Sequence, residues 1–281
     1  MPTNIDTLSY WTKWLAQENE LRLIALNASH VCQDILKTHQ LTEKKALQFA
    51  ESIVGGLLIA STHKENESVN LIVDHSGELR KQVVDATPEG TVRGYVVHKD
   101  AQSEEGFPPM LSVVYTKSHK NNWPYRGVVE FNQESMGEAL MSFCMQSEQL
   151  ITSAGIYVSE TPQGLQASGI LLQIVGGAST QDRQLVESIS SKDLHIYAKQ
   201  LALSDRFDPL QMKPLSKLNF KLMEHSPVTY KCPCNSDRMT RGLKMLPRTE
   251  LEDIFSTQNP IVATCDFCLK QYRFMKEDVL A

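Results

Sequence analysis

The sequence predicts an α+β protein, with an N-terminal domain of mixed helices and β-sheet, a helical linker and a small C-terminal domain. Helix-period and strand-like segments mix along the first 178 residues without a regular β-α-β rhythm. A polar stretch broken by prolines follows, and four of the six cysteines crowd into the last fifty residues. A chain of 281 residues is long enough for a main domain and a small satellite.

The helices of the first domain, residues 1–178, are predicted from apolar residues at helical spacing. Thr42 is placed to cap the longest of them, and its Gly55 and Gly56 predict close packing against another element. The expected helices cover residues 28–37, 43–62 and 134–147.

The sheet of this domain is predicted from β-branched and aromatic runs separated by turn-forming residues. These strands are expected over residues 69–73, 91–97, 111–116, 127–131, 151–158 and 170–175.

Residues 179–231 differ in character from the first domain. Polar helical segments alternate with breaks at Asp208-Pro209, Pro214 and Pro227. We interpret this stretch as an amphipathic linker that lies on the first domain; an ordinary helical subdomain fits the same pattern. Residues 232–281 then form the C-terminal domain.

Composition limits the possible partners. Hydrophobic residues make up 41% and charged residues 22% of the chain, and the formal net charge is −5. An acidic balance of this kind argues against a protein whose main work is neutralising nucleic-acid phosphates.

The N-terminus has no signal-peptide pattern, and the longest apolar run, Ile53 to Ala60, is far shorter than a membrane span. The protein is therefore expected in the cytoplasm, where thiols stay reduced.

The clustered cysteines form two close pairs, Cys232-Pro-Cys234 and Cys265-Asp-Phe-Cys268, with thirty residues between them. Zinc takes four soft ligands in a tetrahedron, and two tight turns are an economical way to supply them. The sequence therefore predicts one Zn²⁺ per chain in the reduced state, with all four cysteines as ligands.

This zinc can be a permanent staple or a redox switch. Thiolates are both the ligands and the oxidisable groups, and each pair is close enough to form its own disulfide. A structural zinc contributes roughly 10–16 kcal/mol in small domains, so its loss should unfold residues 232–281. If the linker loosens too, apolar residues become a surface for unfolded chains. These candidate client-binding residues are Leu194, Ile196, Tyr197, Leu201, Leu218, Phe220 and Leu222.

Two other function classes stay open. One is a thiol–disulfide oxidoreductase working through Cys265 and Cys268, which would need a thioredoxin-like β-α-β context. The other is a nucleic-acid-binding zinc protein.

Cys32 and Cys144 stand among apolar residues and are expected in the core. No nucleotide-binding loop or hydrolase motif is present, so an enzyme is not expected.

Several segments of the chain resemble the redox-regulated 33 kDa chaperonin family of heat-shock proteins. The strongest lie in the C-terminal domain, and fainter ones follow the family's order through the first domain. The C-terminal segments are Tyr230-Lys-Cys-Pro-Cys-Asn-Ser-Asp-Arg238, Leu243-Lys-Met-Leu-Pro247 and Thr264-Cys-Asp-Phe-Cys268; the others are Tyr125-Arg-Gly-Val-Val129, Ser147-Glu-Gln-Leu150 and Gly169-Ile-Leu-Leu-Gln173.

The resemblance implies a stress-response chaperone that holds unfolding proteins without ATP. In the reduced, zinc-bound state it is expected to be a mostly inactive monomer. Oxidant and unfolding stress are expected to join Cys232 to Cys234 and Cys265 to Cys268, release zinc, unfold the linker and favour a homodimer. Reduction then passes clients to ATP-dependent chaperones.

Overall fold

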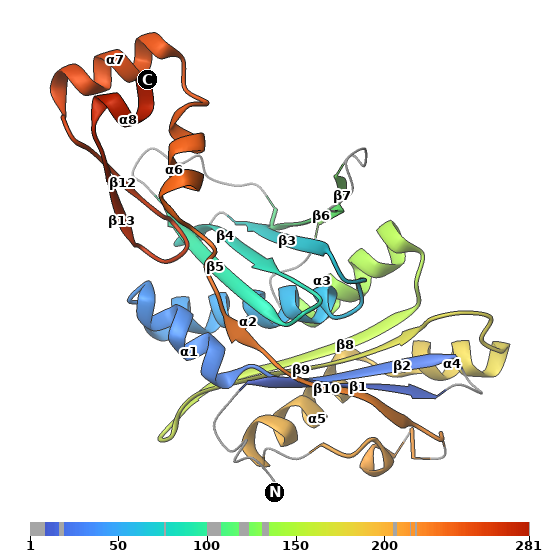
Figure 1. Ribbon diagram of the computed structural model, residues 1–281. Coiled ribbons are helices and arrows are strands. Elements are labelled where there is room, and N and C mark those ends of the chain that lie inside the picture. The colour runs from blue at the N-terminus through green and yellow to red at the C-terminus, as the bar shows by residue number, and fades with distance from the viewer. Residues whose placement is uncertain are drawn as a thin grey trace, which may run out of the picture. The chain divides into compact units, whose positions relative to one another are not determined.

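The computed structural model describes residues 9–16, 20–75, 77–99, 108–117, 124–130, 135–204, 207–213, 215–216 and 218–280. The chain divides into two compact units, Met1–Tyr230 and Lys231–Ala281. The larger unit holds two sheets with helices against them, and the smaller one has a single hairpin and three short helices (Figure 1). The α+β class predicted from the sequence is confirmed.

The first sheet of the larger unit has five antiparallel strands in the order β10-β1-β2-β9-β8. Its central strands are buried on both faces, as expected where helices cover the two sides of a sheet. The strands are β1 (Tyr10–Ala16), β2 (Leu21–Asn27), β8 (Thr152–Thr161), β9 (Gly164–Ile174) and β10 (Lys221–Pro227).

The second sheet has six strands in the order β11-β5-β4-β3-β6-β7, antiparallel except for the β11–β5 pair. Its strands are β3 (Glu67–Asp74), β4 (Leu79–Ala86), β5 (Thr91–His98), β6 (Met110–Lys117), β7 (Tyr125–Glu130) and the short β11 (Thr229–Tyr230).

The main core lies between the two sheets, around the long helix α2 (Glu43–Ala60). Its packing explains the two glycines of this helix. A Cβ atom on Gly56 would lie 2.7 Å from a methyl carbon of Val84, and one on Gly55 would press on Met136. The predicted close packing at these glycines is therefore confirmed. Thr42 stands at the start of the helix, but its side chain makes no capping hydrogen bond, so that part of the prediction is wrong.

Two further helices share this core. Helix α1 (Ser29–Thr38) packs on β9, and α3 (Met136–Phe143) packs on β8. A π-helical turn, Cys144–Glu148, continues α3 and ends at Gln149 in the left-handed region. Cys32 and Cys144 are fully buried, as expected.

The opposite face of the five-stranded sheet is covered by α4 (Thr180–Ser188) and α5 (Ser191–Ser204), which build a second core cluster. A short 3₁₀ turn, Pro209–Gln211, follows, and the side chain of Asp208 accepts a hydrogen bond from Leu210 N at 3.0 Å. The residues predicted as a linker thus contain two helices on the sheet and the edge strand β10. Pro214, Phe131 and Glu134, which fall within the predicted segments, lie outside the described residues.

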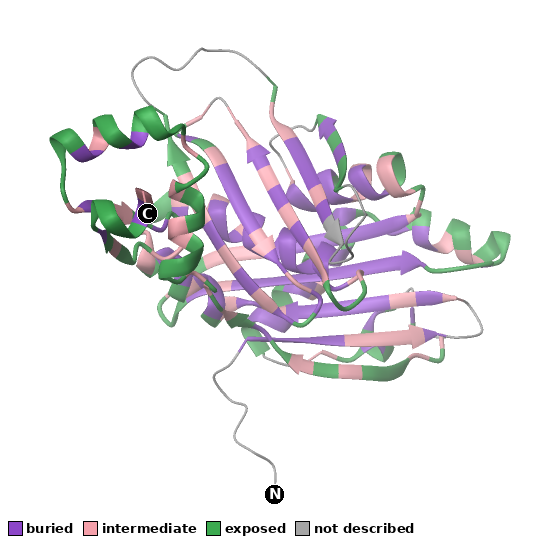
Figure 2. Ribbon diagram, turned by 45° about the horizontal axis from the view of Figure 1, so that its top comes forward, coloured by how far each residue is buried: buried purple, intermediate pink, exposed green. Residues whose placement is uncertain are grey.

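The smaller unit is built from α6 (Ser236–Leu243), α7 (Arg248–Thr257), the β12 (Ile261–Thr264) and β13 (Gln271–Phe274) hairpin, and α8 (Lys276–Leu280). Figure 2 shows how little of it is buried. Its described core has five buried apolar side chains: Leu251, Phe255, Ile261, Phe274 and Val279. Among the described helices of the whole chain, none has the length and apolar character needed to cross a bilayer.

Candidate metal centre

The first cysteine pair lies just before helix α6 of the smaller unit. Cys232 and Cys234 flank Pro233, and Asn235 then begins the helix in an extended conformation. Its side-chain oxygen accepts a hydrogen bond from Arg238 N at 2.8 Å, which is the usual role of an N-terminal cap. Cys234 therefore stands next to the positive end of a helix, a position that favours a thiolate.

The second pair lies in the turn between β12 and β13. The strands pair as far as Thr264 and Gln271. Within the turn, Cys265 N donates to Lys270 O at 3.0 Å and Leu269 N donates to Cys265 O at 2.8 Å, with Leu269 in the left-handed region. These bonds fold the four-residue Cys265–Cys268 segment back on itself. The sulfurs of Cys265 and Cys268 lie within 4.8 Å of each other.

The two segments bring four sulfur atoms together. The ligand atoms of Cys232, Cys234, Cys265 and Cys268 lie within 4.8 Å of one another. The closest approaches run across the pairs: 3.7 Å from Cys232 Sγ to Cys265 Sγ and 3.3 Å from Cys234 Sγ to Cys268 Sγ. In a tetrahedral site with Zn–S bonds of about 2.3 Å, the sulfurs lie about 3.8 Å apart. Four cysteines at this spacing can hold a metal ion, and the all-sulfur donor set fits Zn²⁺.

The four thiols do not ionise alike. Burial favours the neutral thiol of Cys234, but hydrogen bonds from Tyr272 and the neighbouring thiols outweigh it and lower its pKa to about 7. Burial raises the pKa of Cys268 to about 12, and burial also raises the pKa of Cys265. One sulfur therefore ionises near neutral pH, and a divalent cation attracted to it would favour ionisation of the others.

The comparison with protein families decides where this chain belongs. The sequence profile described as "Hsp33 protein" matches residues 9–275, nearly the whole chain. The chain belongs to the Hsp33 family. Its relatives carry the name 33 kDa chaperonin, and the resemblance seen in the sequence is confirmed.

Individual Hsp33 relatives match over almost their full length. The 33 kDa chaperonin of Latilactobacillus sakei is 27% identical over 289 residues, which is 97% of either protein. The 33 kDa chaperonin of Acaryochloris marina is 27% identical over 277 residues, covering 94% of this chain and 93% of the relative. The crystal structure of the 33 kDa chaperonin of Thermotoga maritima has the same fold, with a TM-score of 0.78, 22% identity and coverage of 98% and 97%.

The Hsp33 fold separates the predicted client-binding residues by burial. Leu194 and Leu201 are fully buried in the second core cluster. Ile196 and Leu222 are exposed, at 56% and 49%. The remaining three, Tyr197, Leu218 and Phe220, are partly buried against the same cluster.

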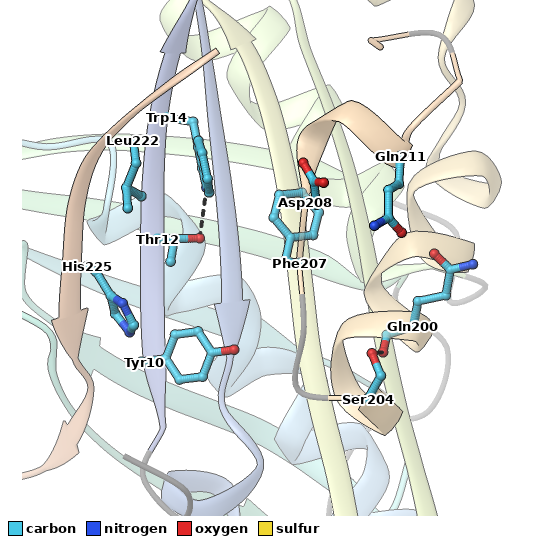
Figure 3. A pocket seen from close by; sticks show the side chains of 10 residues that line it. All are labelled: Tyr10, Thr12, Trp14, Gln200, Ser204, Phe207, Asp208, Gln211, Leu222 and His225. Atoms are coloured by element: carbon cyan, nitrogen blue, oxygen red, sulfur yellow. Dashed lines mark hydrogen bonds between the residues drawn. The ribbon is translucent and has the colours of Figure 1, made fainter. Parts of the chain in front are cut away.

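Leu222 also lines an open pocket of about 730 Å³ that the sequence did not predict (Figure 3). Tyr10 and Trp14 of β1 form its floor, and Phe207 stands opposite them. The alternation Tyr10-Thr12-Trp14 was the available signal, because residues two apart on a strand share one face.

Proposed function

We propose that this chain is a redox-regulated holdase: a chaperone that binds unfolding proteins without ATP and is activated when oxidation releases a bound zinc ion. The observation that carries the proposal is the group of four free cysteines within 4.8 Å, in a unit whose described core has only five buried apolar side chains. The family membership supports the chaperone part of it.

In the reduced state, Cys232, Cys234, Cys265 and Cys268 would hold one Zn²⁺ as thiolates. Such an ion supplies a cross-link between the segment before α6 and the β12–β13 turn. All six cysteines are free thiols in this structure.

Oxidation by a peroxide removes this cross-link. Two thiolate sulfurs give up two electrons to the peroxide, whose O–O bond breaks; an S–S bond forms and two hydroxide ions leave. We expect the disulfides Cys232–Cys234 and Cys265–Cys268. Each thiolate consumed is a ligand lost, so the metal is released as the disulfides form.

The loss would reach the preceding residues through the chain itself. The two-residue strand β11 ends at Tyr230, two residues before Cys232, and edge strand β10 ends only three residues earlier. Loosening residues 179–231 would uncover Leu194 and Leu201 and free the partly covered residues around them. A newly exposed apolar surface of this kind binds unfolded chains.

The proposal includes the setting in which this happens. The reduced chain is a monomer, the oxidised chain is a homodimer, and both work in the cytoplasm. Reduction of the disulfides returns clients to ATP-dependent chaperones. Neither a membrane nor a nucleic acid takes part.

The oxidoreductase alternative finds less support. Cys265 and Cys268 stand in the turn of an antiparallel hairpin, whereas a thioredoxin-like pair begins a helix in a β-α-β unit. A hairpin turn offers no helix N-terminus to activate the first cysteine of that pair.

One experiment separates these functions. The reduced protein is treated with hydrogen peroxide under mild heat, zinc release is followed with a coloured chelator, and light scattering follows the aggregation of chemically denatured citrate synthase. We expect about one zinc per chain released and aggregation suppressed only after treatment. Catalytic reduction of insulin by the untreated protein would instead favour the oxidoreductase.

A further inference from the structure

One side chain outside the cysteine set reaches the metal centre. Tyr272, on β13, donates a hydrogen bond from its hydroxyl to Cys234 Sγ at 3.1 Å. The bond joins residues 38 positions apart in sequence, so it links the hairpin to the segment before α6.

The ring of Tyr272 is held in place from two sides. It stacks on Phe274, with 6.5 Å between the ring centres and 18° between the planes. The ammonium group of Lys270 lies 5.2 Å from the centre of the same ring. Phe274 belongs to the buried core of the unit, and Tyr272 packs partly buried against the same core, so these contacts restrict the positions that its ring can take.

A hydrogen bond to a thiolate changes what the sulfur can do. The donated proton draws on a sulfur lone pair, so the sulfur attacks an oxidant more slowly. Groups that hydrogen-bond to metal ligands also orient them, and their removal typically weakens metal binding by about 10–100-fold. Both effects act on the same atom here.

We propose that Tyr272 is a positioning residue that sets how readily peroxide reaches the switch: its hydroxyl restrains the Cys234 sulfur and keeps it in the metal-binding arrangement. This rests on the proposed redox function and specifies its regulation. The slowed step is attack of the Cys234 sulfur on a peroxide oxygen, in which an S–O bond forms, the O–O bond breaks and hydroxide leaves. A second thiolate then displaces hydroxide from that sulfur to form the disulfide.

The decisive variant is Tyr272→Phe, which removes one oxygen atom and keeps the ring on Phe274. A hydrogen bond to a charged acceptor corresponds to roughly a tenfold factor in equilibrium, and about half of its logarithm carries into nucleophilic attack, which gives a rate increase of about threefold. The matched control is Tyr125→Phe in the larger unit. It loses a hydroxyl bond of similar length, 2.9 Å to Ser147 O, far along the chain from the four clustered cysteines.

Three measurements follow both variants. Stopped-flow mixing with hydrogen peroxide gives the rate of zinc release, and mass spectrometry gives the rate at which iodoacetamide labels Cys234 relative to Cys265. Cobalt-substituted protein gives the sulfur-to-cobalt charge-transfer band, which should move to longer wavelength when the sulfur lone pair is released. A role limited to packing would not move this band.

We expect Tyr272→Phe to release zinc about threefold faster, to label faster at Cys234 and to show the band shift, while Tyr125→Phe matches the parent protein. Lys270→Met, which keeps the hydroxyl, should have a smaller effect in the same direction. An unchanged labelling rate at Cys234 overturns the inference, as does a Lys270→Met effect equal to that of Tyr272→Phe. Absence of zinc from the parent protein would contradict the proposed function instead; labelling rates measured at about pH 10, where Cys234 is a thiolate with or without Tyr272, would still test Tyr272.

Discussion

Removal of the metal from the reduced protein should unfold the smaller unit and leave the larger one intact. Five buried apolar side chains, at about 1.5–3 kcal/mol each, supply roughly 8–15 kcal/mol before any chain entropy is subtracted. Domains retain a net stability of about 0.05–0.15 kcal/mol per residue, which is roughly 3–8 kcal/mol for a unit of this length. A structural zinc contributes about 10–16 kcal/mol, more than the whole net stability.

Hydrogen exchange measures this directly. A zinc chelator is added to the reduced protein at neutral pH, and amide protection is compared before and after. Protection should disappear from the β12–β13 pairing, Ile261 with Phe274 through Thr264 with Gln271, and from α7, while the amides of α2 stay protected. Adding back excess zinc should restore protection. A hairpin and α7 that remain protected without metal would refute the reasoning.

Further predictions concern single residues. Burial raises the pKa of the Glu51 carboxyl from 4.5 to about 7, so the native state keeps a proton that the unfolded chain releases. The free energy of unfolding is therefore lower by up to about 3 kcal/mol above pH 7, and it is unaffected below pH 4.5. Glu51→Gln should raise the stability measured by urea unfolding at pH 8 and not at pH 4. Leu201→Ala, at a fully buried site, should destabilise the larger unit by about 2–5 kcal/mol and lower the temperature at which oxidised protein suppresses aggregation. Burial raises the pKa of Cys144 to about 12 and raises that of Cys32, so neither should react with iodoacetamide in the native protein; labelling at the rate of an exposed thiol would contradict this. Cys265→Ser should lose stable zinc binding, and retention of stoichiometric zinc at neutral pH would show that the ligand set is wrong.

The sequence predicted the helices better than the strands. The α2 segment has a long helical period, and close packing explains its two glycines, Gly56 on Val84 and Gly55 on Met136. Strand β2 was missed because both of its faces are covered, which removes the polar–apolar alternation that marks a half-buried strand. Strand β10 was missed because it ends in Pro227 and is largely exposed at a sheet edge, where propensity is weak.

The sequence likewise predicts one part of the metal centre and not the other. Its four cysteines could be predicted, because ligand type and close spacing are properties of short segments. The crosswise approach of Cys232 to Cys265 and of Cys234 to Cys268 depends on how two distant turns meet. The contact from Tyr272 to Cys234 depends on the same meeting and on the ring stack with Phe274. Nothing in local spacing encodes either of them.

The central claim is that one metal ion, held by oxidisable sulfurs, keeps the client-binding surface covered. The most direct measurement follows zinc release and client aggregation in the same sample during peroxide treatment. Zinc release and the suppression of aggregation should rise together, with about one zinc per chain lost as aggregation stops, and a thiol reductant with added zinc should reverse both. Equal suppression of aggregation by the reduced, zinc-loaded protein would contradict the account.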